Sequence, residues 1–132
     1  MAEGDQSPPG TDLILATLQN AVTAINNLGL SDLLTEATIN STTAGNHTII
    51  SAQSGLVASV YSLFLVVGSS VDITFMDGSA TNLTGPLSMT ANSALFLDNR
   101  KPAWFTCVTN SAFVINTSAA AQVSGRCYYI QE

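Results

Sequence analysis

The sequence predicts a mainly β protein: an antiparallel, jelly-roll-like β-sandwich of about eight strands, preceded by an N-terminal α-helix. Three observations predict it. Short runs of β-branched and aromatic residues recur from residue 47 onward. Glycine, asparagine and proline residues separate these runs at intervals of roughly 8–12 residues, as in antiparallel sandwiches and barrels. In the first third of the chain, apolar residues instead recur at the helical spacing of three and four.

Composition divides the chain into three segments. We expect residues 1–10 to form a flexible arm, because they contain Pro8, Pro9 and two glycines and little that could be buried. Residues 11–36 are the expected helical segment, with a further turn at residues 31–36. Residues 37–132 are the expected β-sandwich domain.

In the helical segment, Thr11 or Asp12 can cap the helix and Gly29 can end it. A lone helix of this length is marginal in water, so its apolar stripe must pack on something. The sequence leaves three choices open: the helix's own domain, copies of the same helix, or another protein. The stripe consists of Ile14, Leu18, Ala21, Ile25 and Leu28.

The expected strands follow one another along the sandwich domain. They are residues 47–51, 56–67, 71–77, 86–90, 94–98, 104–109, 112–117 and 121–130. The dipeptide Asp77–Gly78 directly follows one of them and is the most specific hairpin motif in the chain. Alternation should point Val71, Ile73 and Phe75 to one side. Residues 59–67 are partly apolar on both sides, which predicts a strand that is central in the sandwich or covered by another subunit.

The charge balance excludes several classes of partner. Charged residues make up 9% of the chain, against about 25% in an average protein, so its surface consists mostly of uncharged polar side chains. The net charge is −6 and the bases are Arg100, Lys101 and Arg126, which argues against a nucleic-acid partner.

The longest apolar-rich stretch, residues 56–67, is too short to cross a bilayer, so we expect no membrane partner. The first residues resemble no secretory signal, so we expect synthesis in the cytoplasm.

The residue pattern predicts no catalytic residue, no metal site and no cofactor, and we expect no enzymatic activity. His47 is the single histidine, and Asp72, Asp77 and Asp98 fall in different strands or turns. A serine nucleophile would need a nearby base, and the sequence contains no nucleophile or nucleotide-binding motif.

Two smaller features are candidates for a site. Arg100, Lys101 and Trp104 are the one place where basic and aromatic groups meet, which suits stacking on a ligand or a charged partner, or simply a charged loop before a core tryptophan. Cys107 and Cys127 are too few for a disulfide framework. They form either one disulfide or two small buried thiols.

Short motifs between residues 45 and 132 resemble those of a family of small virion proteins of tailed bacteriophages. The matching residues are Phe75, Gly78, Ser79, Leu83, Thr84, Gly85, Pro86, Ala91, Asn92, Trp104, Phe105, Asn116, Ser118, Ala119, Ala120, Gly125 and Tyr129. The resemblance implies a compact jelly-roll sandwich that forms trimers. It would sit on the virion as a decoration, cement or head-fibre protein. The two cysteines depart from the family's pattern, and the arm and the helix lie outside the match.

The resemblance therefore implies a structural protein on the capsid surface of a virion, made in the host cytoplasm. Its partners would be two further copies of itself and the major capsid protein or another virion protein. The helix stripe would be a trimer or capsid contact. The alternative is a host-recognition module, in which the loop with Arg100, Lys101 and Trp104 binds a host-surface glycan or receptor.

Overall fold

The computed structural model describes residues 15–21 and 34–132. Residues 15–21 are helical and lie within the predicted helical segment. Residues 34–132 form one compact unit, separate from the unit that contains the helix. The predicted arm and the stripe positions Ile14, Ile25 and Leu28 lie outside the described residues.

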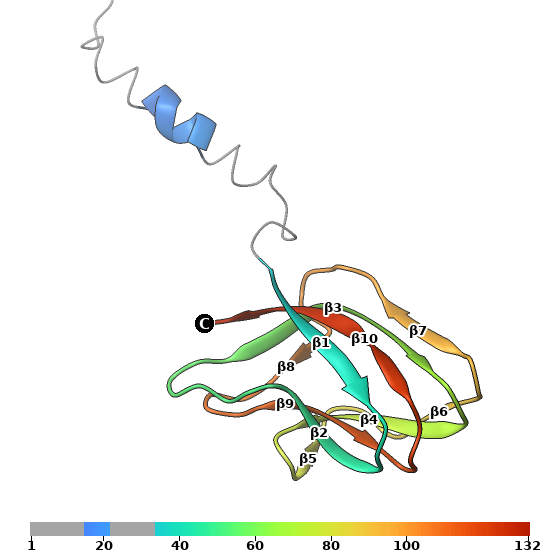
Figure 1. Ribbon diagram of the computed structural model, residues 1–132. Helices are drawn as coiled ribbons and strands as arrows, with labels where there is room; N and C mark the ends of the chain where they lie inside the picture. Colours follow the sequence, from blue (N-terminus) through green and yellow to red (C-terminus); the bar gives the residue numbers. More distant parts are fainter. Residues whose placement is uncertain (1–14, 22–33) are drawn as a thin grey trace, which may run out of the picture. The chain divides into compact units, whose positions relative to one another are not determined.

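Ten strands make up the described part of the sandwich, and every pairing between them is antiparallel (Figure 1). They are β1 (Thr35–Ser41), β2 (Gly45–Ile50), β3 (Ala58–Val67), β4 (Val71–Asp77), β5 (Thr81–Asn82), β6 (Leu87–Met89), β7 (Ala94–Leu97), β8 (Phe105–Thr106), β9 (Phe113–Thr117) and β10 (Val123–Gln131).

The strands lie in two sheets. Sheet 1 has the order β1-β10-β3-β7, and β8 also pairs with β3. Sheet 2 has the order β2-β9-β4-β5, and β6 also pairs with β4. The chain changes sheet after β1, β2, β3, β6, β8 and β9, so neighbours in sequence repeatedly face each other across the core. This arrangement confirms the predicted antiparallel, jelly-roll-like β-sandwich.

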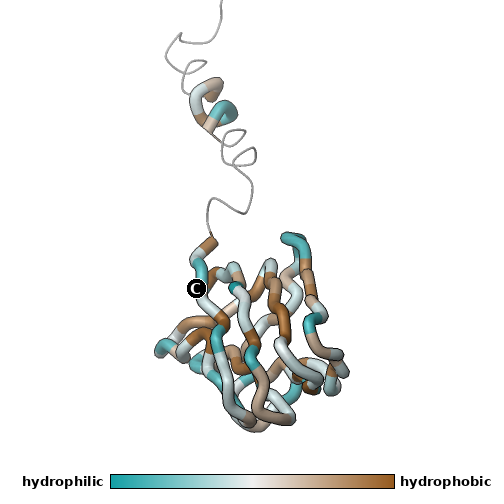
Figure 2. Tube along the Cα trace, turned by 45° about the vertical axis from the view of Figure 1, so that its right-hand side comes forward, coloured by the Kyte–Doolittle hydropathy of each residue, from teal (hydrophilic) through white to brown (hydrophobic). Residues whose placement is uncertain are grey.

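The core fills the space between the two sheets. Val71, Ile73 and Phe75 all point into it, as their alternation predicts, with exposed fractions of 4% or less. The ring of Phe75 packs on Phe105 at 4.7 Å and on Phe113 at 5.9 Å between centroids. Burying each large apolar side chain stabilises the fold by about 1.5–3 kcal/mol. Figure 2 shows the apolar stretches that run along the strands.

The structure differs from the prediction at the start of the sandwich. Strand β1 begins at Thr35, so Thr35 and Glu36 belong to the sandwich and not to a helical turn. In β1 only Ile39 is fully buried, because the strand lies at the edge of sheet 1. An edge strand with one buried residue has too weak an alternation to be recognised from sequence. The two-residue strand β5 was not predicted for a similar reason, since both its residues are exposed.

Gly125 is required where the backbone of β10 lies close to that of its neighbour β3. A side chain there would place its Cβ 2.7 Å from the Cα of Leu65 and 2.8 Å from the carbonyl carbon of Phe64. Backbone atoms cannot move aside cheaply, so only glycine permits this close approach of two central strands.

Candidate functional site

The solvent-facing side of sheet 1, called here the outer face of sheet 1, carries an exposed aromatic pair. Strand pairing aligns Thr38, Arg126, Phe64 and Phe96 in one row across β1, β10, β3 and β7. Phe64 and Phe96 are direct cross-strand neighbours, with ring centroids 6.3 Å apart and planes 21° from parallel. Such cross-strand aromatic pairs hold adjacent strands in register.

Val66 extends the aromatic pair into an apolar patch, defined here as Phe64, Val66 and Phe96. Val66 lies two residues beyond Phe64 on β3 and therefore on the same side of the sheet. The exposed fractions are 38% for Phe64, 41% for Val66 and 69% for Phe96. Scattered apolar residues are common on protein surfaces, whereas contiguous exposed apolar side chains mark binding sites more often.

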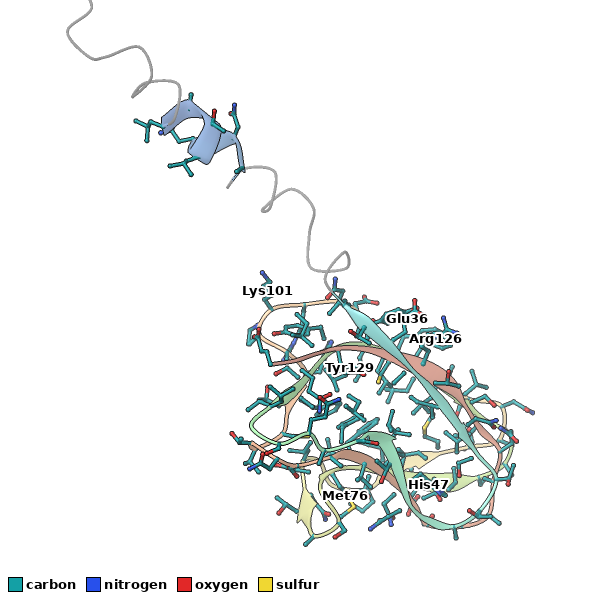
Figure 3. The ribbon with its side chains drawn as sticks, turned by 60° about the vertical axis from the view of Figure 1, so that its left-hand side comes forward. Glu36, His47, Met76, Lys101, Arg126 and Tyr129 are labelled. Carbon is teal, nitrogen blue, oxygen red and sulfur yellow. The ribbon has the colours of Figure 1, made fainter. Side chains whose placement is uncertain are left out.

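An ion pair adjoins the patch on the same face. A terminal nitrogen of Arg126 lies 3.1 Å from a carboxylate oxygen of Glu36, and the two side chains are 43% and 56% exposed. Figure 3 shows both residues at the surface, on β10 and β1. Because the pair is in water, it adds little to the stability of the fold, about 0–1 kcal/mol.

The sequence did not identify this patch. It did predict that residues 59–67 are apolar on both sides, and the structure places this strand centrally in sheet 1. Its inner side supplies the core residues Leu63 and Leu65, and its outer side supplies Phe64 and Val66. Phe96 could be linked to Phe64 only through the register of β7 on β3, which no local pattern encodes.

The loop between β7 and β8 brings Arg100 and Trp104 together. The Arg100 guanidinium carbon lies 3.8 Å from the centre of the Trp104 ring, a cation–π contact. The Arg100 Nε–H donates to the Pro102 carbonyl at 3.2 Å, and the Trp104 indole N–H donates to the Asp98 carbonyl at 2.6 Å. Lys101 lies exposed in the same loop (Figure 3). One face of the tryptophan is thus already covered, so a stacked ligand must take the other face or displace Arg100.

The two cysteines are free thiols buried in the core. Both cysteines lie beside β3, at positions five residues apart along that strand. The Cys107 N–H donates to the Ala58 carbonyl, whereas Cys127 pairs with Leu63. Five residues of β-strand span roughly 16 Å, far more than the 4.4–6.8 Å between Cα atoms that a disulfide bridges.

Burial keeps both thiols protonated. It raises the pKa of Cys127 to about 12, and burial together with the adjacent Asp77 carboxylate raises the pKa of Cys107 to about 12. A thiol is nucleophilic only as the thiolate, so neither cysteine has the character of a reactive residue.

The His47 side chain forms hydrogen bonds within the turn between β1 and β2, which joins the two sheets. Its Nε2 lies 2.8 Å from the Thr43 carbonyl and 2.8 Å from the Ser41 hydroxyl, and the buried Thr117 hydroxyl also donates to the Thr43 carbonyl. Since a carbonyl only accepts, Nε2 carries the proton. The ring therefore ties β1 to β2.

The carboxylates lie in separate places in the sandwich. Asp77 is buried beside Cys107, and one of its oxygens accepts the Val108 N–H at 3.0 Å. Within residues 15–21 and 34–132, no three His, Cys, Asp or Glu side chains are grouped closely enough to hold a metal ion. In the same residues no helix is long and apolar enough to cross a membrane.

Two positions of the helix stripe fall in the described residues. Leu18 is 59% exposed and Ala21 is exposed, as is the neighbouring Leu15 at 55%. Packing of the stripe on the helix's own domain, on copies of the same helix or on another protein remains a prediction.

The chain was compared with known proteins. No protein-family model matches it, and no curated protein matches it. Among solved structures, a similar chain comes from work entitled "Bacillus endospore appendages form a novel family of disulfide-linked pili". It is 23% identical, the match covers 74% of this chain and 84% of that chain, and the TM-score is 0.43. This likeness assigns the chain to no family.

Proposed function

We propose that this protein is a structural component of a tailed-bacteriophage virion, a capsid decoration or head-fibre protein that assembles as a homotrimer on the particle surface. The observation that carries the proposal is the apolar patch of Phe64, Val66 and Phe96 on the outer face of sheet 1. A patch of stacked aromatic and aliphatic side chains on a flat sheet is stabilised when another protein surface covers it.

The motif residues that resemble phage virion proteins support the proposal, because several of them sit where the backbone needs them. Gly78 and Asn92 have φ angles of +69° and +64° in tight turns. Gly125 lies where the backbones of β10 and β3 approach each other closely. These motif residues suit the turns and the strand pairing in which they lie, which supports the proposal.

The uncharged surface also supports an assembly role. The three bases and nine acids are spread over 132 residues, and much of the sandwich exterior is serine, threonine and asparagine. Such a surface can be buried in a particle with little cost for removing charges from water.

The proposal is tested by mass and by attachment. Light scattering after size exclusion should give three times the chain mass of 13.7 kDa. The purified protein should then cosediment with capsids that were assembled without it, and mass spectrometry should find the chain in mature particles. A protein that cosediments with no capsid and is absent from particles would contradict the proposal.

The cation–π pair of Arg100 and Trp104 favours a second candidate, recognition of a host glycan or receptor. Aromatic rings that stack on sugars usually lie beside hydrogen-bonding groups, and this loop has both. Glycan-array binding that is lost in Trp104→Ala while the fold is retained would favour it. Capsid attachment by the same variant would favour the structural role.

A further inference from the structure

We infer that the outer face of sheet 1 binds a second copy of this chain, through the apolar patch and through an exchange of Arg126 and Glu36 between copies. The inference rests on the proposed function, because it names the partner of the surface that carries that proposal.

The patch needs an apolar counterpart. Phe96 is the most exposed large apolar side chain in the described part of the chain, at 69%, and from the edge strand β7 it stacks on Phe64 of β3. Burial of such a pair removes apolar area from water without ordering a loop, since strand pairing already fixes both side chains in register. A surface with the same patch supplies this counterpart.

The charges select a copy of the same chain. The ion pair joins one base and one acid 3.1 Å apart, so the pair has no net charge. A strongly acidic or basic partner would gain attraction from one residue and repulsion from the other. Neighbouring copies of the chain instead offer a carboxylate for Arg126 and a guanidinium for Glu36, which complement the pair.

The ion pair can exchange partners because nothing else holds it. The described contacts of the Arg126 guanidinium and the Glu36 carboxylate are with each other, and both side chains are about half exposed. Around a three-fold axis, the patches of three copies can meet at the axis while each copy gives Arg126 to one neighbour and Glu36 to the other.

The first experiment compares two exposed apolar residues. Phe96→Ser removes the most exposed residue of the patch, and Val108→Ser removes a residue of similar exposure, 65%, on the loop after β8. In light scattering over a dilution series, Phe96→Ser should dissociate at a protein concentration at least about tenfold higher than the native protein does. Val108→Ser should associate as the native protein does.

The second experiment asks whether the ion pair forms between chains. Glu36→Arg and Arg126→Glu each leave like charges on the face and should each weaken association. An equimolar mixture of the two single variants should recover mixed assemblies, detected by native mass spectrometry with one variant isotope-labelled. Neither variant can form the pair within its own chain, so recovery requires a contact between chains.

The outcomes separate this inference from the proposed function. Native association that Phe96→Ser leaves unchanged, or charge variants that do not complement each other, would overturn the inference while capsid attachment still stands. A Phe96→Ser protein with native mass that no longer attaches to capsids would also overturn it, because the face would then bind the shell. A native protein that stays monomeric at every concentration tested would overturn it too, and cosedimentation would decide the function independently.

Discussion

The two outer faces of the sandwich have the same architecture and different surfaces. On sheet 1 the two middle strands are flanked by β1 and β7, and Phe64 and Val66 of β3 project into solvent. On sheet 2 the middle strands β9 and β4 also carry apolar residues outward, Val114 and Met76, but these are 4% and 7% exposed.

The difference lies in their neighbours. In sheet 2, the row of Val114 and Met76 ends in Thr48 on one side and Asn82 on the other. The next row carries an Asn46–Asn116 hydrogen bond of 2.7 Å. Polar side chains thus surround the apolar atoms of this face, whereas the row of Phe64 on sheet 1 ends in the still more exposed Phe96. An apolar residue on an outer face therefore indicates an interface only when its cross-strand neighbours leave its side chain exposed to solvent.

The largest expected effect comes from adding a side chain at Gly125, where β10 and β3 of sheet 1 approach each other closely. Gly125→Ala should destabilise the sandwich by about 3 kcal/mol or more, because its Cβ would overlap the backbone of Phe64 and Leu65. Urea unfolding measures the loss. Gly85→Ala is the matched control, since a Cβ there meets nothing within 4 Å. Equal stability of the two variants would contradict this account of Gly125.

The second prediction separates buried from exposed aromatic residues. Phe75→Ala should lower the free energy of unfolding by about 3–5 kcal/mol, because it empties the centre of the core. Phe96→Ala should lower it by less than about 1 kcal/mol when measured on dissociated protein, because most of the ring is already in water. A large loss for Phe96 in the monomer would mean that the patch stabilises its own sheet instead of a contact.

The third prediction concerns the inner side of sheet 1 at alkaline pH. The pKa of each cysteine, ordinarily 9.0, is raised to about 12 in the fold, so the unfolded chain releases these protons first. A raised pKa contributes stability that is present below pH 9 and is lost as pH rises toward 12. Urea midpoints should therefore fall between pH 9 and pH 11, and fall less in a Cys107→Ala/Cys127→Ala variant. Parallel profiles for the two proteins would show that the thiols do not contribute.

The smallest effect is expected on the outer face of sheet 2. Asn116→Ala removes the hydrogen bond to Asn46 and should cost about 0.5–1.5 kcal/mol in urea unfolding. The same variant should associate as the native protein does, because this face is not the proposed contact. If Asn116→Ala changed the solution mass, the contact between copies would lie on the outer face of sheet 2 instead of sheet 1.

The sequence predicts the sandwich well because its inner residues alternate strongly. Strand β4 falls at the predicted residues 71–77, and its hairpin follows at Gly78. Strand β1 was not predicted, since a strand with one buried residue, Ile39, shows no recognisable alternation of apolar and polar residues. The assignment of Thr35 and Glu36 to a helical turn was wrong for this reason.

The candidate face could be predicted only in part. The two-sided apolar character of residues 59–67 predicts a strand that is central in the sandwich or covered by another subunit, but the residues beside Phe64 on the outer face come from distant strands. Arg126 meets Glu36 across 90 positions of sequence, and Phe64 meets Phe96 through a register that depends on the whole sheet. The proximity of Arg100 and Trp104, four residues apart, is local and was predicted from the sequence.

The position of β10 has a consequence for how the protein is made. This strand is the last of the sandwich in sequence, yet it lies between β1 and β3 in sheet 1 and pairs with both along its length. Sheet 1 therefore cannot close while β10 is still on the ribosome, and the earlier strands must wait with their apolar sides unpaired. A chain interrupted before residue 123 lacks the strand that joins its edge to its centre. Translation errors that shorten the chain would then be removed by failure to fold.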